Sequence, residues 1–162
     1  MSLTVRKAER EDSDRIAKLA MNLVEQHVAY DPVRFARIAT IDGMAGFYGS
    51  QMDSDQATVL VAEDAGTLVG FAYVGYEERS YEDLLVRAAW LHDIYVMEDW
   101  RASGVGSALI NTAREFAKRV GASKLMLSVA SKNIAARGFF EQAGFKTTMH
   151  EMMLAVDDGT DG

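Results

Sequence analysis

Residues 101–106, Arg-Ala-Ser-Gly-Val-Gly, form a glycine-rich turn between a strand-like segment and an amphipathic helical segment. Leu91–Val96 before the turn has the composition of a strand, and Ser107–Val120 after it has helical periodicity. The N-terminus of a helix leaves backbone N–H groups without partners and carries the positive end of the helix dipole. Glycine lets such a backbone approach a ligand closely. The turn therefore predicts a site for a phosphate group.

Two common phosphate-binding motifs do not account for this turn. A dinucleotide fold requires a third glycine in G-x-G-x-x-G, and Leu109 occupies that position. The phosphate loop G-x-x-x-x-G-K-[ST] does not occur in the chain. A tight strand-to-helix connection that binds no ligand stays an alternative interpretation of the glycines.

Charge is unevenly distributed along the chain, whose formal net charge is −7. Residues 1–100 have a net charge of −9, residues 101–150 of +6 and residues 151–162 of −4. A basic block that begins at the glycine-rich turn suits a polyanionic ligand, and the acidic remainder suits a cationic one, although solvated surface charge gives the same pattern. Nucleic acid is disfavoured because the chain is acidic overall and shows no interleaving of basic and aromatic residues.

The composition is that of a folded domain of 162 residues, 49% hydrophobic and 25% charged. The chain contains no cysteine, which excludes disulfides and thiolate metal sites and favours a reducing compartment. Its apolar runs are shorter than the ~20 residues of a membrane helix, and its N-terminus lacks a signal-peptide core. We therefore expect a cytoplasmic protein with a single domain over residues 1–156 and a disordered C-terminal tail over 157–162.

Hydrophobic periodicity predicts alternating strands and helices around one central sheet, an α/β class. Strands are expected at Leu3–Ala8, Thr58–Glu63, Leu68–Tyr76, Trp90–Val96, Lys124–Val129, Phe145–Thr148 and His150–Val156. Helices are expected from Asp12 or Ser13 to Asp31, from about Val33 to Tyr48 with an interruption near Gly43, and over Ser107–Val120 and Ile134–Ala143. A hairpin turn is expected at residues 64–67 and a polar connection at Glu77–Asp83.

A second segment, Asn133–Phe145, accompanies the glycine-rich turn. Arg101–Gly106 matches the pattern [RQ]-x-x-G-x-[GA], and Asn133–Phe145 is similar to N-x-x-A-x-x-[LF]-Y-E-x-x-G-F. Together, residues 91–156 resemble the GNAT superfamily of acetyl-CoA-dependent N-acetyltransferases. Leu91–Met97 looks like the corresponding strand of spermidine/spermine-type small-amine acetyltransferases. The resemblance implies a GNAT fold (α+β), whose central mixed, mainly antiparallel sheet of six to seven strands splays after Val96 and is flanked by about four helices.

The resemblance assigns acetyl-CoA to the glycine-rich turn and implies no metal. Backbone amides of the turn and the helix dipole would neutralise the pyrophosphate, and Arg101 would position it. Backbone groups of the preceding strand would pair with the pantetheine arm, and Asn133 would contact the cofactor as well as cap the next helix. The residues implied at the cofactor are Ile94, Tyr95, Val96, Arg101, Ala102, Ser103, Gly104, Val105, Gly106, Ser107, Asn133, Arg137 and Phe140.

Acetyl transfer to an amine requires a base, because a primary ammonium with a pKa near ~10.4 cannot attack a thioester. Of the three histidines, His92 alone lies on the strand that enters the turn, where the resemblance implies a glutamate or histidine base. We predict His92 and Asp93 as catalytic residues; the alternative is a histidine packed beside Trp90 and Ile94. Regular alternation places Asp93 on the opposite strand face, where it orients a neighbour or faces the substrate. Both side chains line one cleft wall only if a bulge intervenes.

Phe140 departs from the pattern that the resemblance implies, in which a tyrosine protonates the departing coenzyme A thiolate. Three interpretations follow. The thiolate, from a thiol with a pKa near ~8.5, leaves with water as proton source; another hydroxyl, such as Tyr30, Tyr81 or Ser131, substitutes; or the chain is a slow or non-catalytic acyl-CoA binder. Loss of a general acid costs about 10²–10⁴-fold, which slows a reaction without abolishing it, so we favour an enzyme.

We therefore expect direct transfer of acetyl from acetyl-CoA to the primary amine of a small molecule, such as a polyamine or an amino acid. Acidic residues that would attract a cationic substrate are Glu77, Glu78, Glu82 and Asp83. The alternatives are a catalytically weak acyl-CoA-binding or regulatory domain, and an acetyltransferase that acts on a protein N-terminus or lysine. The sequence predicts no nucleic-acid or membrane partner and leaves a homodimer open.

Overall fold

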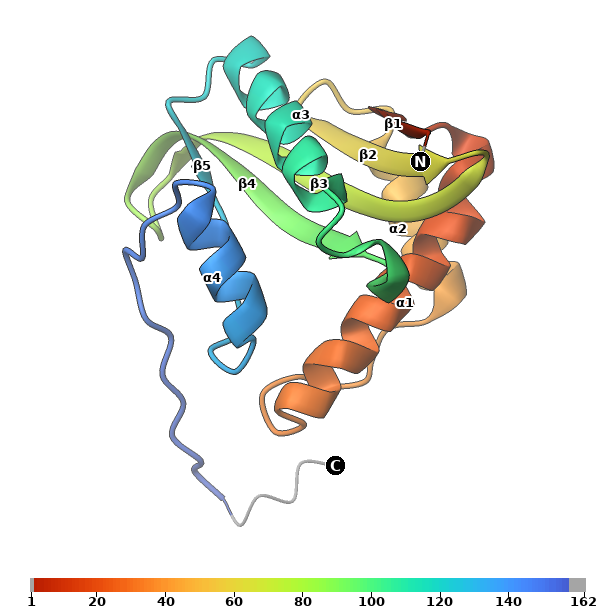
Figure 1. The fold of residues 1–162 in the computed structure, drawn as a ribbon. Coiled ribbons are helices and arrows are strands. Elements are labelled where there is room, and N and C mark those ends of the chain that lie inside the picture. The colour runs from red at the N-terminus through yellow and green to blue at the C-terminus, as the bar shows by residue number, and fades with distance from the viewer. Residues whose placement is uncertain (1, 158–162) are drawn as a thin grey trace. The chain divides into compact units, whose positions relative to one another are not determined.

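The computed structural model of the chain describes residues 2–157 (Figure 1). The chain divides into two compact units. The first comprises Met1–Asn22 and Ala39–Ser128, and the second Leu23–Ile38 and Val129–Gly162. The single domain expected over residues 1–156 stays a prediction, and all but the first residue of the expected tail lie outside the described part of the chain.

The first unit contains a five-stranded sheet in the order β1-β2-β3-β4-β5 (Figure 1). Its strands are β1 (Leu3–Lys7), β2 (Ala57–Asp64), β3 (Thr67–Ser80), β4 (Leu85–Val96) and β5 (Lys124–Met126). Neighbours from β1 to β4 run antiparallel, and β5 pairs parallel with β4. The mixed, mainly antiparallel sheet is confirmed, with five strands among the described residues in place of the expected six to seven.

Residues 2–157 contain four α-helices, as expected (Figure 1). They are α1 (Ser13–Tyr30), α2 (Ile41–Gln51), α3 (Val105–Arg119) and α4 (Ile134–Gln142), and two short 3₁₀ helices are η1 (Arg10–Asp12) and η2 (Glu98–Trp100). Helix α1 begins in the first unit and ends in the second, and α4 belongs to the second unit. None of the helices in the described part of the chain is long and apolar enough to span a membrane.

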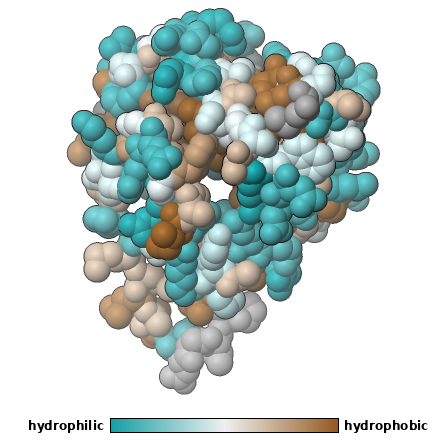
Figure 2. All heavy atoms as spheres, in the orientation of Figure 1, coloured by the Kyte–Doolittle hydropathy of each residue, from teal (hydrophilic) through white to brown (hydrophobic). Residues whose placement is uncertain are grey.

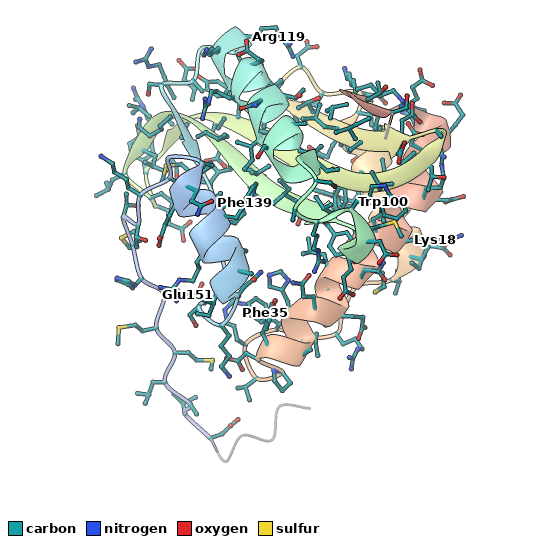
Figure 3. The ribbon with its side chains drawn as sticks, viewed as in Figure 1. Lys18, Phe35, Trp100, Arg119, Phe139 and Glu151 are labelled. Carbon is teal, nitrogen blue, oxygen red and sulfur yellow. The ribbon has the colours of Figure 1, made fainter. Side chains whose placement is uncertain are left out.

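Apolar periodicity explains why α3 packs against the sheet. Residues at three- and four-residue spacing give the helix one buried face, against β2, β3 and β4. That buried face consists of Val105, Leu109, Ile110, Ala113, Phe116 and Ala117. Arg119, labelled in Figure 3, ends the helix, where a basic side chain complements the dipole. Charged and polar side chains cover much of the surface drawn in Figure 2.

A buried carboxylate fixes the connection between β1 and α1. Asp12 is only 2% exposed and accepts hydrogen bonds from both Nη atoms of Arg6, at 2.8 and 3.1 Å. It also accepts from Arg15 Nη2 at 2.7 Å and from the backbone N–H of Glu9 at 2.8 Å. The Arg6 bonds, more than any other contact, lower the pKa of Asp12 to about 2. The carboxylate therefore serves the fold rather than the chemistry.

The helix expected over about Val33–Tyr48 is wrong in its first half. Residues 33–40 are not helical, and α2 begins at Ile41 because Thr40 is its N-cap. The Thr40 side chain accepts a hydrogen bond from the N–H of Gly43 at 3.0 Å. Gly43 thus lies in the first turn of α2 and does not interrupt a helix.

The polar connection expected at Glu77–Asp83 is also shorter than predicted. Strand β3 continues to Ser80, with Glu77 opposite Ala88 and Arg79 opposite Val86 in β4. Exposed charged side chains are compatible with a strand that has one solvated face, so the acidic composition does not by itself indicate a loop. In the other direction, β5 ends at Met126, three residues before the predicted end.

The two terminal strands expected at Phe145–Thr148 and His150–Val156 are wrong for the described chain. The structure assigns no strand to residues 145–156. The N–H of Phe145 bonds to the carbonyl of Phe140 and closes the end of α4, as the glycine stop at Gly144 (φ 104°) implied. A strand also needs a neighbour for its backbone groups, and sequence alternation alone does not supply one.

Candidate active site

The glycine-rich turn joins η2 to α3 as the sequence predicted. Gly104 is the N-cap of α3 and has φ 89°, a left-handed conformation that favours glycine. No side chain caps this helix, so the N–H groups of its first turn, from Val105 to Ser107, point out of the helix start without an intrahelical acceptor. Ala102 also has a positive φ, 65°. The turn thus presents a run of backbone donors of the kind that holds an anion.

Two side chains fix the start of this turn. Trp100 donates from its indole N–H to Asp64 at 3.1 Å, which ties η2 to the hairpin of β2 and β3 and lowers the pKa of Asp64. Arg101 donates from Nε to the carbonyl of Val96 at 2.8 Å, and its guanidinium lies 5.4 Å from the centre of the Tyr95 ring. The Val96 carbonyl, expected to be available for a pantetheine arm, therefore already has a donor.

Strand β4 has an edge that β5 does not cover. The two strands pair only at Ala88–Trp90 of β4 and Lys124–Met126 of β5. Beyond Trp90, residues 91–96 of β4 pair with β3 on one side and with no described strand on the other. The sheet therefore splays before Val96, earlier than predicted, and the backbone groups of Ile94 and Tyr95 stand at the resulting gap.

A β-bulge lies at His92. Tyr73 of β3 faces Asp93, the next residue Val74 faces Leu91, and His92 between them has no partner in the register. A bulge inserts one extra residue and so shifts the alternation of the strand. It brings His92 and Asp93 to the same side of the sheet, the arrangement that regular alternation forbids.

Side chains from α2 and β3 hold the two bulge residues. Tyr48 of α2 donates its hydroxyl to Asp93 Oδ2 at 2.8 Å, and Tyr73 of β3 donates to Gln51 Oε1 of α2 at 2.9 Å. The Tyr73 and His92 rings stack with centroids 5.1 Å apart. Burial, more than the adjacent Asp93 carboxylate, raises the pKa of Tyr48 far above its ordinary range. Tyr48 is therefore a neutral donor to Asp93 at any working pH.

The surroundings of His92 favour the neutral form of its imidazole. Removal of water by its neighbours lowers the pKa of His92, and this outweighs the Asp93 and Glu77 carboxylates, which raise it. Gly75 makes room for the ring, because a Cβ at that position would lie 3.3 Å from His92 Nε2. At neutral pH the side chain can therefore accept a proton, with a carboxylate nearby to stabilise the imidazolium that forms.

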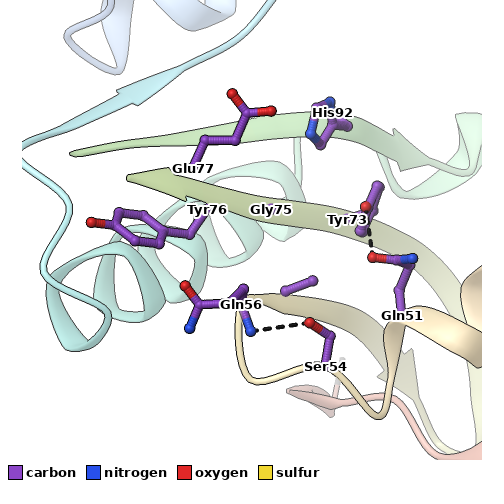
Figure 4. A pocket seen from close by; sticks show the side chains of 9 residues that line it. Gln51, Ser54, Gln56, Tyr73, Gly75, Tyr76, Glu77 and His92 are labelled. Atoms are coloured by element: carbon purple, nitrogen blue, oxygen red, sulfur yellow. Dashed lines mark hydrogen bonds between the residues drawn. The ribbon is translucent and has the colours of Figure 1, made fainter. Parts of the chain in front are cut away.

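A polar cavity of about 200 Å³ adjoins His92 (Figure 4). It is lined by Gln51, Ser54, Gln56, Ala57, Tyr73, Gly75, Tyr76, Glu77 and His92. Neutral polar groups surround most of it, and Glu77 and His92 lie on neighbouring strands at one side in Figure 4. The cavity thus combines a proton acceptor, a carboxylate and hydrogen-bonding amides within the first unit.

The remaining predicted cofactor residues lie in the second unit. Asn133 is the N-cap of α4 and accepts a hydrogen bond from the N–H of Ala136 at 3.2 Å, so its alternative role as a helix cap is observed. Arg137 donates to the carbonyl of Ser131 at 3.1 Å. Phe140 is buried, with its ring 5.6 Å from Phe139 and 5.8 Å from Phe145.

None of the three hydroxyls proposed in place of a tyrosine at 140 lies in the cavity lining. Tyr30 accepts a hydrogen bond from Gln26, and Tyr81 is 79% exposed in the turn after β3. Sequence reasoning instead missed Tyr48 and Tyr73. Tyr73 shares the alternation of Phe71 and Gly75, but only the position of α2 reveals that Tyr48 reaches Asp93.

The fold is that of known N-acetyltransferases. An aminoglycoside N-acetyltransferase solved in complex with CoA superposes with a TM-score of 0.76 and 15% identity, over 94% of this chain and 93% of that one. Two relatives have similar sequences. The uncharacterized N-acetyltransferase YhfO of Bacillus subtilis is 25% identical over 146 residues, 89% of this chain and 90% of the relative. The thialysine N-epsilon-acetyltransferase of Bos taurus is 28% identical over 142 residues, 86% of this chain and 82% of the relative.

A sheet that splays beside a glycine-rich turn is thus the fold of the known N-acetyltransferases. The profile of the acetyltransferase (GNAT) family matches residues 22–145, which is most of the chain. The protein therefore belongs to the GNAT family and is an N-acetyltransferase.

Proposed function

We propose that this enzyme transfers the acetyl group of acetyl-CoA directly to the primary amine of a small polar molecule, with His92 as the general base. The observation that carries the proposal is the bulge in β4. It turns His92 and Asp93 to one side of the sheet, where His92 lines a polar cavity of about 200 Å³. A space of this size can hold a small amine.

The turn at residues 101–107 fits a pyrophosphate. The uncapped first turn of α3 offers backbone donors, and Gly104 and Ala102 hold the loop in a left-handed conformation that aims them. Arg101 adds a positive charge beside them, and the uncovered edge of β4 at Ile94 and Tyr95 suits an extended pantetheine arm. When bound, acetyl-CoA would supply a thioester carbonyl and a thiolate leaving group.

Two residues of β4, His92 and Asp93, would take part in the proton transfers. An ammonium group that enters the cavity gives one proton to His92, whose lowered pKa keeps it neutral and ready to accept. Asp93, held by Tyr48, stabilises the imidazolium. As the amine nitrogen bonds to the acetyl carbon and the carbon–sulfur bond breaks, the second proton of the amine passes to the thiolate through water. The product is an amide and a thiol, and His92 returns its proton to solvent.

Solvent protonation of the thiolate follows from Phe140. Its ring packs on aromatic neighbours and carries no proton. A thiolate whose conjugate acid has a pKa of ~8.5 is a good leaving group without a general acid. The name of the Bos taurus relative, which specifies an N-epsilon amine, supports an aliphatic primary amine as acceptor. The acidic side chain of Glu77 in the cavity lining supports a cationic one.

Acetyl-CoA turnover against a panel of polyamines, amino acids, aminoglycosides and peptides would test this proposal. We expect activity on small amines and a loss of about 10²–10⁴-fold in kcat/KM for His92→Gln. The acidic limb of the pH profile should report an apparent pKa below 6.5 in the wild type and be absent in His92→Gln. His150→Gln, an exposed position, is the matched control. Retention of that limb in His92→Gln, or activity on peptides alone, would overturn the proposal.

A further inference from the structure

His92 lies between two aromatic side chains of the sheet. Its ring stacks on that of Tyr73, with centroids 5.1 Å apart and planes at 24°, and on that of Trp90, with centroids 6.3 Å apart and planes at 17°. Both separations lie within the range of ~4.5–7 Å that aromatic pairs prefer. Along β4, Trp90 precedes His92, whereas Tyr73 of β3 faces Asp93, the residue that follows it. The two rings therefore approach the imidazole from opposite sides.

No hydrogen bond from the described residues fixes the imidazole of His92. Burial and the charges of Asp93 and Glu77 shift its pKa, and no hydrogen bond contributes to that shift. A histidine that moves protons is ordinarily oriented by a hydrogen bond from one ring nitrogen to a carboxylate or a carbonyl. The Asp93 carboxylate instead accepts from the hydroxyl of Tyr48 at 2.8 Å. Aromatic packing is therefore what restrains the His92 ring.

Helix α2 holds Tyr73 in place. The Tyr73 hydroxyl donates to Oε1 of Gln51 at 2.9 Å, a bond that Figure 4 draws as a dashed line. The ring of Tyr73 also contacts those of Phe47 and Tyr48, with centroids 5.4 and 5.8 Å apart. The interplanar angles of 90° and 77° are those of edge-to-face pairs. Tyr73 therefore offers His92 a surface that is itself fixed from three directions.

Gly75 of β3 leaves room for the stacked rings. It faces Trp90 across the pair of strands, so no side chain of the directly opposite residue displaces the indole. A Cβ at Gly75 would lie 3.3 Å from His92 Nε2 and 3.7 Å from the hydroxyl oxygen of Tyr73. Since rings cover both faces of the imidazole, only its edge, which carries the two nitrogens, is left to meet a molecule in the cavity that His92 lines.

We propose that Tyr73 and Trp90 are the positioning residues of the base: their rings form an aromatic slot that holds the His92 imidazole edge-on to the amine, where other enzymes use a hydrogen-bonded carboxylate. The inference rests on the proposed role of His92 as general base. A base acts only within hydrogen-bond reach of the proton that it takes, and a displacement of about 1 Å costs up to ~10²-fold in rate. The aromatic slot also keeps water from both ring faces, and this burial lowers the pKa of His92.

Substitutions that remove or keep each ring test the aromatic slot, with the amine of the panel that gives the highest kcat/KM. Tyr73→Leu and Trp90→Leu should each lower kcat about 10–10²-fold and leave KM for acetyl-CoA within about twofold, because only the base is displaced. Tyr73→Phe and Trp90→Phe keep a ring on each face and should retain at least about a third of the wild-type kcat. Tyr81→Leu, at an exposed tyrosine in the turn after β3, is the matched control and should keep the wild-type kcat. Equal losses in Tyr73→Leu and Tyr73→Phe would contradict the aromatic slot, because they would assign the effect to the hydroxyl bond with Gln51.

NMR titration of the imidazole tests the aromatic slot without turnover. The chain has three histidines, so the spectrum of His92→Gln identifies the His92 signal. Tyr73→Leu admits water to one ring face and should raise the pKa of His92 toward 6.5, whereas Tyr73→Phe should leave it as in the wild type. Circular dichroism checks that each variant keeps the wild-type helix content, and the Tyr73 pair alone decides the outcome if Trp90→Leu does not fold.

The two readouts separate the aromatic slot from the role of the base. An unchanged titration of His92 in Tyr73→Leu would refute the aromatic slot even where His92→Gln abolishes the acidic limb of the pH profile. Retention of that limb in His92→Gln would overturn the proposed function, and the positioning role with it, whichever way the His92 signal moves.

Discussion

Replacement of Asp12 by Asn should destabilise the protein by an amount that depends on pH in a defined way. The carboxylate is buried and accepts hydrogen bonds from Arg6, Arg15 and the backbone of Glu9. A pKa that falls from 3.8 in the unfolded chain to about 2 in the fold corresponds to roughly 2.5 kcal/mol of stability at neutral pH. The Asp12→Asn variant should therefore lose about this much free energy of unfolding at pH 7.

The direction of this pH dependence follows from proton binding to Asp12. The unfolded state takes up the proton of Asp12 at a higher pH than the folded state, so the contribution is complete above about pH 5 and declines as pH falls toward 2. At pH 3 about half of the difference between wild type and Asp12→Asn should remain. Urea unfolding followed by tryptophan fluorescence at the two pH values measures both differences.

Asp53→Asn is the control for this experiment. Asp53 pairs with Arg10, and both side chains are well exposed, so its removal should cost about 0–1 kcal/mol with little change between pH 7 and pH 3. A loss in Asp12→Asn that is the same at both pH values would show that the buried carboxylate acts through packing alone. That result would refute the reasoning from its ion pairs.

Three further predictions concern the site. Glu77→Gln should raise KM for a cationic amine roughly two- to fivefold at low salt and leave kcat unchanged. Glu78 does not line the cavity, so Glu78→Gln should change neither constant. Equal effects of the two variants would contradict a role of Glu77 in binding the amine. Tyr48→Phe removes the 2.8 Å hydrogen bond to Asp93 and should lower the free energy of unfolding by about 1.5–3 kcal/mol, so unchanged urea unfolding would argue against it. Phe140→Tyr should alter kcat by less than ~10²-fold, and turnover found only in this variant would refute solvent protonation of the thiolate.

The sequence predicted those features that depend on local pattern. Gly104 and Gly121 stand at the helix ends where short-range rules require them, with φ 89° and 87°. The order of the glycine-rich turn and Asn133–Phe145 indicated the family, which the profile match confirms. Each motif is itself a continuous stretch of sequence, Arg101–Gly106 or Asn133–Phe145.

The features that the sequence did not reveal depend on distant partners. The bulge at His92 is a register relation between β3 and β4, and nothing in the residues of β4 alone requires it. Tyr48 reaches Asp93 across 45 positions of sequence. The strand predicted at His150–Val156 was wrong for the described chain because alternation gives the capacity to pair but not the partner.

The bulge at His92 also shifts the alternation of side chains along β4, so residues before and after it follow opposite odd–even patterns. Before it, odd-numbered residues such as Ala89 and Leu91 fill the core; after it, the odd-numbered Asp93 faces the cavity side instead. Loss of His92 would restore a regular ladder in which Leu91 still faces Val74 and Asp93 still faces Tyr73, so the later side chains would keep their surfaces while the imidazole is lost. A natural or designed deletion of His92 would therefore yield a regular sheet that lacks the proposed base. Selection for thermal stability alone would therefore favour loss of this irregularity at the cost of activity.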